Sequence, residues 1–155
     1  MPPKSKVVAD ALESPCGITR TLGVLSDPWA FLILRSSFLG QRTFAEFRYS
    51  LGIATDVLTA RLNTLVEQGI FKKVPYQHAG QRTRHAYDRT MAGQELLTVL
   101  ISMQQWGDAH LVSNKPREVL PVRRDSDSKV RVSLVDEEGS FVNSADTEFV
   151  REHSG

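Results

Sequence analysis

The chain has 155 residues, one cysteine and a formal net charge of +1. Hydrophobic residues make up 41% of it and charged residues 24%, which predicts one packed domain with at most a small appendage and excludes a disordered chain. A single cysteine excludes an intrachain disulfide framework and a multi-cysteine metal cluster. The longest apolar stretch, residues 29–34, is too short to span a bilayer, and residues 1–6 lack the apolar segment of a signal peptide. We therefore expect a cytoplasmic protein without a membrane partner.

Charge is distributed unevenly along the chain. Residues 1–115 hold 13 Lys and Arg against 9 Asp and Glu, whereas residues 116–155 hold 6 against 9. Between residues 42 and 89 there are eight basic side chains and four acidic ones. A basic middle followed by an acidic end favours a polyanionic ligand such as a nucleic acid.

Helix signals dominate the first forty residues. Apolar residues at helical spacing predict a short helix near 7–12 and a second one over 18–25, separated by the Pro-Cys-Gly break at 15–17. The Asp-Pro pair at 27–28 is a typical helix start. The apolar run over 29–39 that follows predicts a central buried helix, which ends at a glycine.

The next two helices are predicted to be joined by a tight turn. Thr43 and Glu46 have the spacing of a capping box and begin one helix, which Gly52 closes. Residues 54–68 then form an amphipathic helix. Its leucines repeat at i, i+4 and i+7: Leu58, Leu62 and Leu65. Two helices joined in this way form a helix-turn-helix.

A hairpin and a long helix are expected after the helix-turn-helix. Residues 70–76 and 85–88 read as strands, and the polar residues 77–84 between them form a basic loop, or wing. A helix over 91–112 follows. We therefore expect a mainly α fold with a small β wing, an α+β winged helix-turn-helix, over residues 1–115.

The last forty residues, 116–155, are predicted to be a separate extension of short β-strands. Apolar residues alternate with polar ones over 130–134, and a turn at 136–139 leads into 141–142. Phe149 and Val150 are expected to add a third short strand.

Six short motifs follow one another between residues 15 and 112. They are residues 15–22 (PCGITRTL), 27–40 (DPWAFLILRSSFLG), 42–48 (RTFAEFR), 51–70 (LGIATDVLTARLNTLVEQGI), 87–93 (YDRTMAG) and 105–107 (QWG). In order and in register they resemble the motifs of HxlR-type winged helix-turn-helix regulators of the MarR-like superfamily. The resemblance implies a homodimeric transcriptional repressor or activator, with terminal helices at the dimer interface, double-stranded DNA as partner, no cofactor and a place on the nucleoid.

Several positions depart from the family pattern. Residues 26–28 (Ser-Asp-Pro) replace the usual glycine pair or glycine–lysine, and Ala54 replaces the usual serine before the second helix of the pair. Ala60 replaces a glutamine, and Asp56 replaces a basic or polar residue. Because these positions lie where bases would be read, we expect an operator sequence unlike those of relatives.

The candidate base-reading residues lie opposite the leucine stripe. At about 100° per residue, a helix that turns those leucines inward points its opposite side to solvent, and the N-terminal half of such a helix enters the major groove. The candidates are Thr55, Asp56, Thr59, Ala60 and Asn63. For Asp56 the alternative is to complement the helix dipole, and for Thr59 and Asn63 it is simple solvation.

Arginines are the candidates for contacts to the DNA backbone. Arg82 and Arg84 on the wing suit a minor groove or a line of phosphates. Arg42 and Arg48 flank the first helix of the pair and either bind the backbone or are solvated. Arg61 either reaches a phosphate or braces a neighbouring acid.

A homodimer is expected because one copy presents too little surface for tight operator binding. A two-fold dimer places two recognition helices about 34 Å apart, on successive major-groove turns of a palindromic operator. The helix over 91–112 and the N-terminal helix are the expected dimer surfaces. We expect a sequence-specific transcriptional repressor, and a winged-helix protein-interaction module is the competing class.

An enzyme is not expected, because the sequence has no P-loop, nucleophile elbow or Rossmann glycine pattern. The histidines have no metal-ligand spacing: His78, His85, His110 and His153.

Two features of the sequence suggest a response to a signal. Cys16 is either a redox sensor or a small buried apolar residue. A small-molecule effector would bind in the 116–155 extension or in a dimer cleft. Four aromatic residues line such a cleft or pack in the core: Trp29, Phe31, Phe38 and Trp106.

Overall fold

The computed structural model describes residues 6–152, and only the backbone of residues 7 and 8. These residues form two compact units that divide between Leu100 and Ile101, inside the helix α6 (Met91–His110). His153, one of the four histidines without metal-ligand spacing, and residues 1–5, part of the N-terminal segment without a signal peptide pattern, lie outside the described residues. Over the range 6–152, none of the helices combines the length and the apolar character that a membrane span requires.

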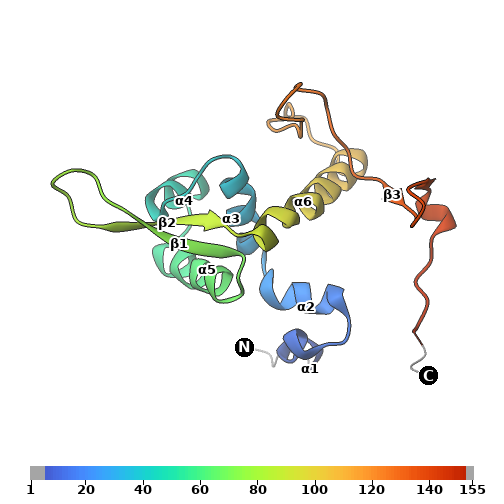
Figure 1. Cartoon of the computed structure of the whole chain (residues 1–155), viewed down its shortest axis with the longest axis horizontal. Helices are drawn as coiled ribbons and strands as arrows, with labels where there is room; N and C mark the ends of the chain where they lie inside the picture. Colours follow the sequence, from blue (N-terminus) through green and yellow to red (C-terminus); the bar gives the residue numbers. More distant parts are fainter. Residues whose placement is uncertain (1–5, 153–155) are drawn as a thin grey trace. The chain divides into compact units, whose positions relative to one another are not determined.

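The first unit is a winged helix-turn-helix, as predicted (Figure 1). Its elements are α1 (Lys6–Ala9), η1 (Ala11–Glu13), α2 (Gly17–Val24), α3 (Pro28–Phe38), α4 (Phe44–Leu51), α5 (Thr55–Glu67), β1 (Phe71–Tyr76), β2 (Arg84–Arg89) and the first half of α6. The boundaries lie within two residues of the predicted ones for α3, α5 and both strands, because capping residues and glycines mark these ends in the sequence.

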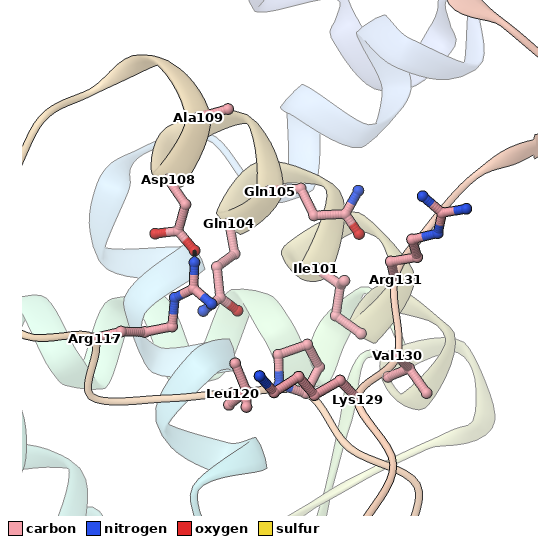
Figure 2. Close-up of a pocket in the computed structure, with 11 residues that line it drawn as sticks. Ile101, Gln104, Gln105, Asp108, Ala109, Arg117, Leu120, Lys129, Val130 and Arg131 are labelled. Atoms are coloured by element: carbon pink, nitrogen blue, oxygen red, sulfur yellow. Dashed lines mark ion pairs between the residues drawn. The ribbon is translucent and has the colours of Figure 1, made fainter.

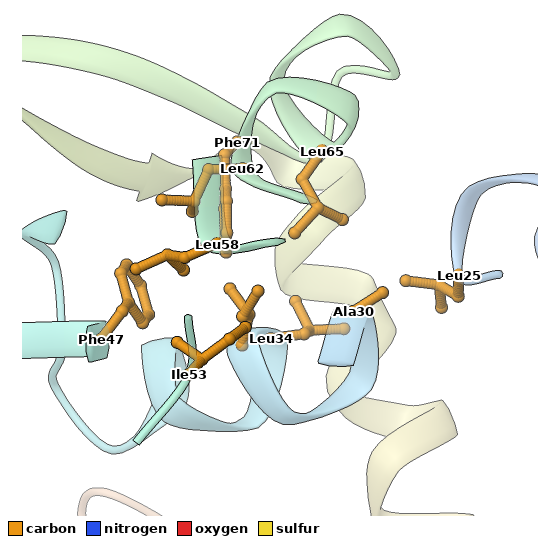
Figure 3. Packing of buried hydrophobic residues seen from close by; sticks show 10 residues of the cluster. Leu25, Ala30, Leu34, Phe47, Ile53, Leu58, Leu62, Leu65 and Phe71 are labelled. Atoms are coloured by element: carbon orange, nitrogen blue, oxygen red, sulfur yellow. The ribbon is translucent and has the colours of Figure 1, made fainter. Parts of the chain in front are cut away.

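The central helix α3 begins at the predicted signal. Asp27 is its N-cap, and the Asp27 carboxylate accepts a hydrogen bond of 3.1 Å from the amide of Ala30. The core around this helix is drawn in Figure 3. Its buried members come from the loop before α3, from α3 and α4, from the turn between α4 and α5, from α5 and from β1: Leu25, Ala30, Ile33, Leu34, Phe47, Ile53, Leu58, Leu62, Leu65 and Phe71. Both the central helix and the inward leucine stripe are therefore confirmed.

The turn between α4 and α5 depends on one capping box and one glycine. The amide of Glu46 donates to the Thr43 hydroxyl (3.2 Å), and the Glu46 carboxylate accepts from the Thr43 amide (2.9 Å). Gly52 has φ +60°, a left-handed conformation that glycine adopts without the steric cost a side chain brings. The chain therefore turns sharply after α4, and α5 begins after only three intervening residues.

The wing is a two-stranded antiparallel hairpin in which Phe71 pairs with Arg89 and Tyr76 pairs with Arg84. Figure 1 shows the loop over 77–83 projecting away from the helices. At the base of the hairpin, the Phe71 ring stacks on Phe47 of α4, with 6.3 Å between ring centroids. One aromatic pair thus connects the wing to the helix-turn-helix.

The start of α6 is fixed against the end of the helix-turn-helix. The amide of Gly93 donates to the Thr90 hydroxyl (3.1 Å), and the Thr90 amide donates to the carbonyl of Ile70 (3.0 Å). Gly93 is buried, and a Cβ at this position would collide with the Ile70 carbonyl oxygen. Leu96 and Leu100 pack against the core one and two turns further on.

The second unit contains the C-terminal half of α6 and the extension. Its strands are β3 (Leu134–Val135) and β4 (Phe141–Val142), which pair antiparallel, and η2 (Ser144–Asp146) follows them. None of its described residues is buried. The unit thus has short β-strands, as expected, but no buried core of its own.

Two details of the extension differ from the prediction. Residues 130–133 do not form a strand, because both backbone groups of Val132 bond to the side chain of Gln105 instead of to a neighbouring strand. The third strand at 149–150 is also absent from the described chain, where no second strand pairs with these residues. Alternation in the sequence indicates extended backbone, but it does not supply the partner that a strand needs.

Candidate nucleic-acid interface

The five candidate base-reading residues share the exposed side of α5. The three stripe leucines are at most 1% exposed, so α5 is anchored firmly by its inner side. The outer side carries exposed side chains only, as the helical spacing predicted: Thr55, Asp56, Thr59, Ala60 and Asn63. Whether these side chains contact bases stays a prediction, but the structure brings them together on one accessible face.

Their chemistry differs from residue to residue. The Thr59 hydroxyl donates to the carbonyl of Thr55 (2.8 Å), which leaves its oxygen and its methyl group for a ligand. Within the described part of the chain, the side chain of Asn63 has no hydrogen-bond partner, so its amide group offers a donor and an acceptor together. An adenine presents the complementary pair in the major groove, with an acceptor at N7 and a donor at N6. Asp56 lies in the first turn of α5, where a carboxylate also complements the helix dipole.

Arg61 braces α5 against the start of α3. Both its Nε and its Nη2 bind the Asp27 carboxylate, in a partly buried ion pair. Burial raises the pKa of Asp27, but the hydrogen bond from Arg61 and the amide of Ala30 lower it by more, so the net pKa lies below its usual value. Of the two roles expected for Arg61, the structure shows the contact with a neighbouring acid. It also explains the Asp-Pro sequence at 27–28, since Asp27 both caps α3 and holds α5.

Arg42 is also held in an ion pair. Its Nε and Nη2 both lie 2.7 Å from the Asp88 carboxylate on β2, which joins the start of α4 to the wing. The hydrogen bond from Arg42 is the largest contribution that lowers the pKa of Asp88. The Arg42 amide donates to the Glu46 carboxylate (2.7 Å) as well. Arg42 therefore positions the wing, and its side chain remains 55% exposed beside the interface.

Three arginines remain available for a polyanion. Arg48 on α4, Arg82 on the wing loop and Arg84 at the start of β2 are exposed. None of the three has an ion-pair partner among residues 6–152. The loop itself is shaped by Gln77, whose side-chain amide donates to the carbonyl of Gln81 (2.6 Å). Exposed basic side chains thus lie in the same unit as the exposed side of α5.

The family comparison matches this architecture. The model of the HxlR-like helix-turn-helix family matches residues 24–115, which is more than half of the chain. The chain belongs to the HxlR family.

Relatives and solved structures of similar sequence are also known. Rv3095 of Mycobacterium tuberculosis, an HTH-type transcriptional regulator, is 39% identical over 94 residues; the match covers 61% of this chain and 58% of Rv3095. The crystal structure of PA1607, a candidate transcription factor, is 34% identical with a TM-score of 0.79, and covers 92% of this chain and 99% of PA1607. The redox regulator HypR, in its reduced form, is 25% identical with a TM-score of 0.54 over 61% of this chain and 92% of HypR.

The extension of this HxlR chain is shared with a solved structure. The family model ends at residue 115, yet PA1607 covers 92% of the chain, which residues 1–115 alone are too few to supply. The extension is thus an addition to the HxlR domain that at least one structural relative also has.

Three residues that the sequence did not single out belong to the structure around the candidate residues: two acids that hold arginines and one exposed tyrosine on α4. The sequence identifies Asp27 only as a helix cap and gives no role to Asp88, because their partners Arg61 and Arg42 lie 34 and 46 positions away in the chain. No local pattern reports such a pair. Tyr49, by contrast, falls outside the apolar stripe of α4, so helical spacing could have identified it as exposed; it is 94% exposed beside Arg48.

The aromatic residues and histidines considered as ligand or metal sites have structural roles or form no site within the described residues. Trp29, Phe31 and Phe38 pack against the core, which is the alternative to lining a ligand cleft. Trp106 is exposed and its ring lies 5.2 Å from that of His110. Between residues 6 and 152, no three His, Cys, Asp or Glu side chains are grouped as metal ligands would be.

Proposed function

We propose that this protein is a homodimeric transcriptional repressor that binds a palindromic operator in double-stranded DNA. The exposed side of α5 enters the major groove, and Arg82 and Arg84 of the wing contact the phosphates or the minor groove beside it. The observation that carries this proposal is the combination of an accessible, leucine-anchored α5 with exposed arginines that have no partner in the described chain. A chain bound in this way is located on the nucleoid and blocks transcription from the site that it covers.

Exposed apolar surface supports the homodimer. Ile18 and Leu22 of α2 are 59% and 55% exposed, and α6 buries only Gly93 of its 20 residues. Leaving this much apolar surface in water is unfavourable, and a second copy of the same chain covers it in a two-fold arrangement. These apolar residues belong to α2 and α6, so the dimer that we propose does not use the base-reading residues of α5.

Selection from random double-stranded DNA tests the proposal. We expect the full chain to enrich one specific sequence, and its affinity to fall steeply as salt is raised. A reporter placed behind that sequence is expected to give lower output in cells that contain the protein. Recovery of no sequence above background would contradict the proposal and would favour the competing class, a winged-helix module that binds another protein.

We further propose that Cys16 makes DNA binding sensitive to oxidants. Cys16 is exposed and precedes α2, and the Thr19 backbone amide in the first turn is the largest contribution that lowers the pKa of its thiol. A lowered pKa increases the fraction of reactive thiolate at neutral pH. HypR, a structural neighbour of this chain, is a redox regulator, which supports a redox role for Cys16.

Substitution Cys16→Ser tests the redox proposal. Diamide is expected to weaken operator binding by the wild type, whereas the Ser variant is expected to bind equally well with and without it. The measurement is an operator titration at fixed salt, repeated after a reductant is added. Equal responses of the two proteins to diamide would rule out Cys16 as the sensor.

A further inference from the structure

The second unit contains a cavity of about 370 Å³, and none of the residues that line it is a candidate DNA-binding residue. Figure 2 shows that one wall comes from the C-terminal half of α6 and the other from two segments of the extension, near residues 117–121 and 129–131. Small-molecule sites in proteins commonly have volumes of about 300–1,000 Å³, so this cavity is large enough for a ligand.

Hydrogen bonds hold the two walls together. The Gln105 side chain donates to the carbonyl of Val132 (3.0 Å) and accepts from its amide (2.5 Å), as one strand does with another. The Gln104 side chain donates to the carbonyl of Val119 (2.7 Å). The cavity is therefore formed before any ligand arrives, which lowers the entropy cost of binding.

Its apolar lining is entirely aliphatic. The apolar residues are Ile101, Ala109, Leu120, Pro121 and Val130. No aromatic ring is among the residues that line this cavity. A lining of this kind favours a hydrocarbon chain over a flat aromatic ring, for which stacking partners are absent here.

The charged lining is predominantly basic. Arg117, Lys129 and Arg131 face a single acid, Asp108, whose carboxylate already lies 2.9 Å from Arg117. Neither Lys129 nor Arg131 has an ion-pair partner in the described part of the chain. In Figure 2 Lys129 extends beside Leu120, and Arg117 and Arg131 lie on opposite sides of the group of lining residues. One cation is thus neutralised and two are free for an anion.

We propose that this cavity binds an aliphatic monocarboxylate of medium chain length. Its carboxylate is bound by Lys129 and Arg131, and its hydrocarbon tail covers the aliphatic lining. The unit has no buried core of its own, so a tail in this place supplies apolar contacts that the unit otherwise lacks. An effect of the ligand on operator binding would rest on the proposed function, whereas binding itself does not.

The test is calorimetric titration of the full chain with sodium hexanoate in the absence of DNA. Acetate carries the same charge without the tail, and hexylammonium carries the same tail with the opposite charge. We expect hexanoate to bind at least about tenfold more tightly than either, because only hexanoate satisfies both the cations and the aliphatic lining. A failure of operator binding leaves this result unaffected, so the two proposals are tested separately.

Two charge variants give opposite expected results. Lys129→Gln removes a free cation and is expected to weaken hexanoate binding about threefold, the size of a partly exposed ion pair. Asp108→Asn releases Arg117 and is expected to tighten binding by a similar factor. Arg124→Gln, on the same segment of the extension but outside the cavity lining, is the matched control and is expected to change nothing.

Three outcomes would overturn the proposal. Hexylammonium or acetate binding as tightly as hexanoate would remove the requirement for an aliphatic anion. Affinities of the Lys129 and Asp108 variants that equal that of the wild type would remove the cavity as the site. A hexanoate affinity that falls as the protein concentration rises would assign the cavity to a second copy of the chain.

Discussion

The double substitution Arg82→Gln/Arg84→Gln is expected to weaken operator binding on the order of a hundredfold at physiological salt, since a dimer loses four charge contacts at a few tenths to 1 kcal/mol each. The loss is expected to be similar for every DNA sequence, because phosphate contacts carry no base information. The slope of log affinity against log salt is expected to flatten by about 0.9 for each lost contact, and thus by nearly four. The measurement is a salt titration of binding to the selected operator and to an unrelated duplex.

Arg123→Gln/Arg124→Gln is the matched control for the wing variant. It removes the same number of charges from the extension, which lies outside the family match, and is expected to leave the salt slope unchanged. An unchanged slope in the wing variant would mean that the wing does not contact DNA. A slope that flattens by only about two would mean that one chain, not a dimer, occupies each operator.

Phe47→Ala is expected to lower the free energy of unfolding by about 3–5 kcal/mol, the usual cost of removing a buried aromatic ring. Phe47 is fully buried, and its ring stacks on Phe71, so the substitution leaves a cavity where α4 meets the wing. Urea denaturation measures the loss. DNA binding is expected to fall with it, since α5 and the wing are positioned from this same core.

Tyr49→Ala is the natural comparison, because Tyr49 lies on the same helix but is 94% exposed. A surface substitution of this kind is expected to change the free energy of unfolding by no more than about 0.5 kcal/mol. If the two alanine variants unfold at the same urea concentration, the core assignment around α4 is wrong.

Much of the first unit could be predicted because its signals are local. Asp27, the Thr43–Glu46 capping box and Gly52 each fix a helix end within three or four residues, and the structure confirms all of them. The leucine stripe of α5 is also local, since one turn of a helix predicts the next. These features determine which side of α5 is exposed, and so the sequence could define the candidate base-reading face in advance.

The ion pairs and the extension could not be predicted in the same way. The bond from Arg61 to Asp27 joins residues 34 positions apart, and only the packing of α5 on α3 brings them together. In the extension, Val132 has the alternation of a strand, but Gln105 takes both of its backbone hydrogen bonds. In both places the local structure depends on a partner that is distant in the chain, and a single sequence does not show which residue that partner is.

The central claim is that the exposed side of α5 reads bases in a two-fold dimer. Its most direct test compares the DNA sequences selected by the wild type and by Asn63→Ala. For the wild type, we expect a motif with two-fold symmetry and half-sites about 10 base pairs apart. The Asn63 variant is expected to retain the symmetry and spacing but to lose its preference at one position in each half-site. An asymmetric wild-type motif, or identical base preferences for the two proteins, would contradict this claim.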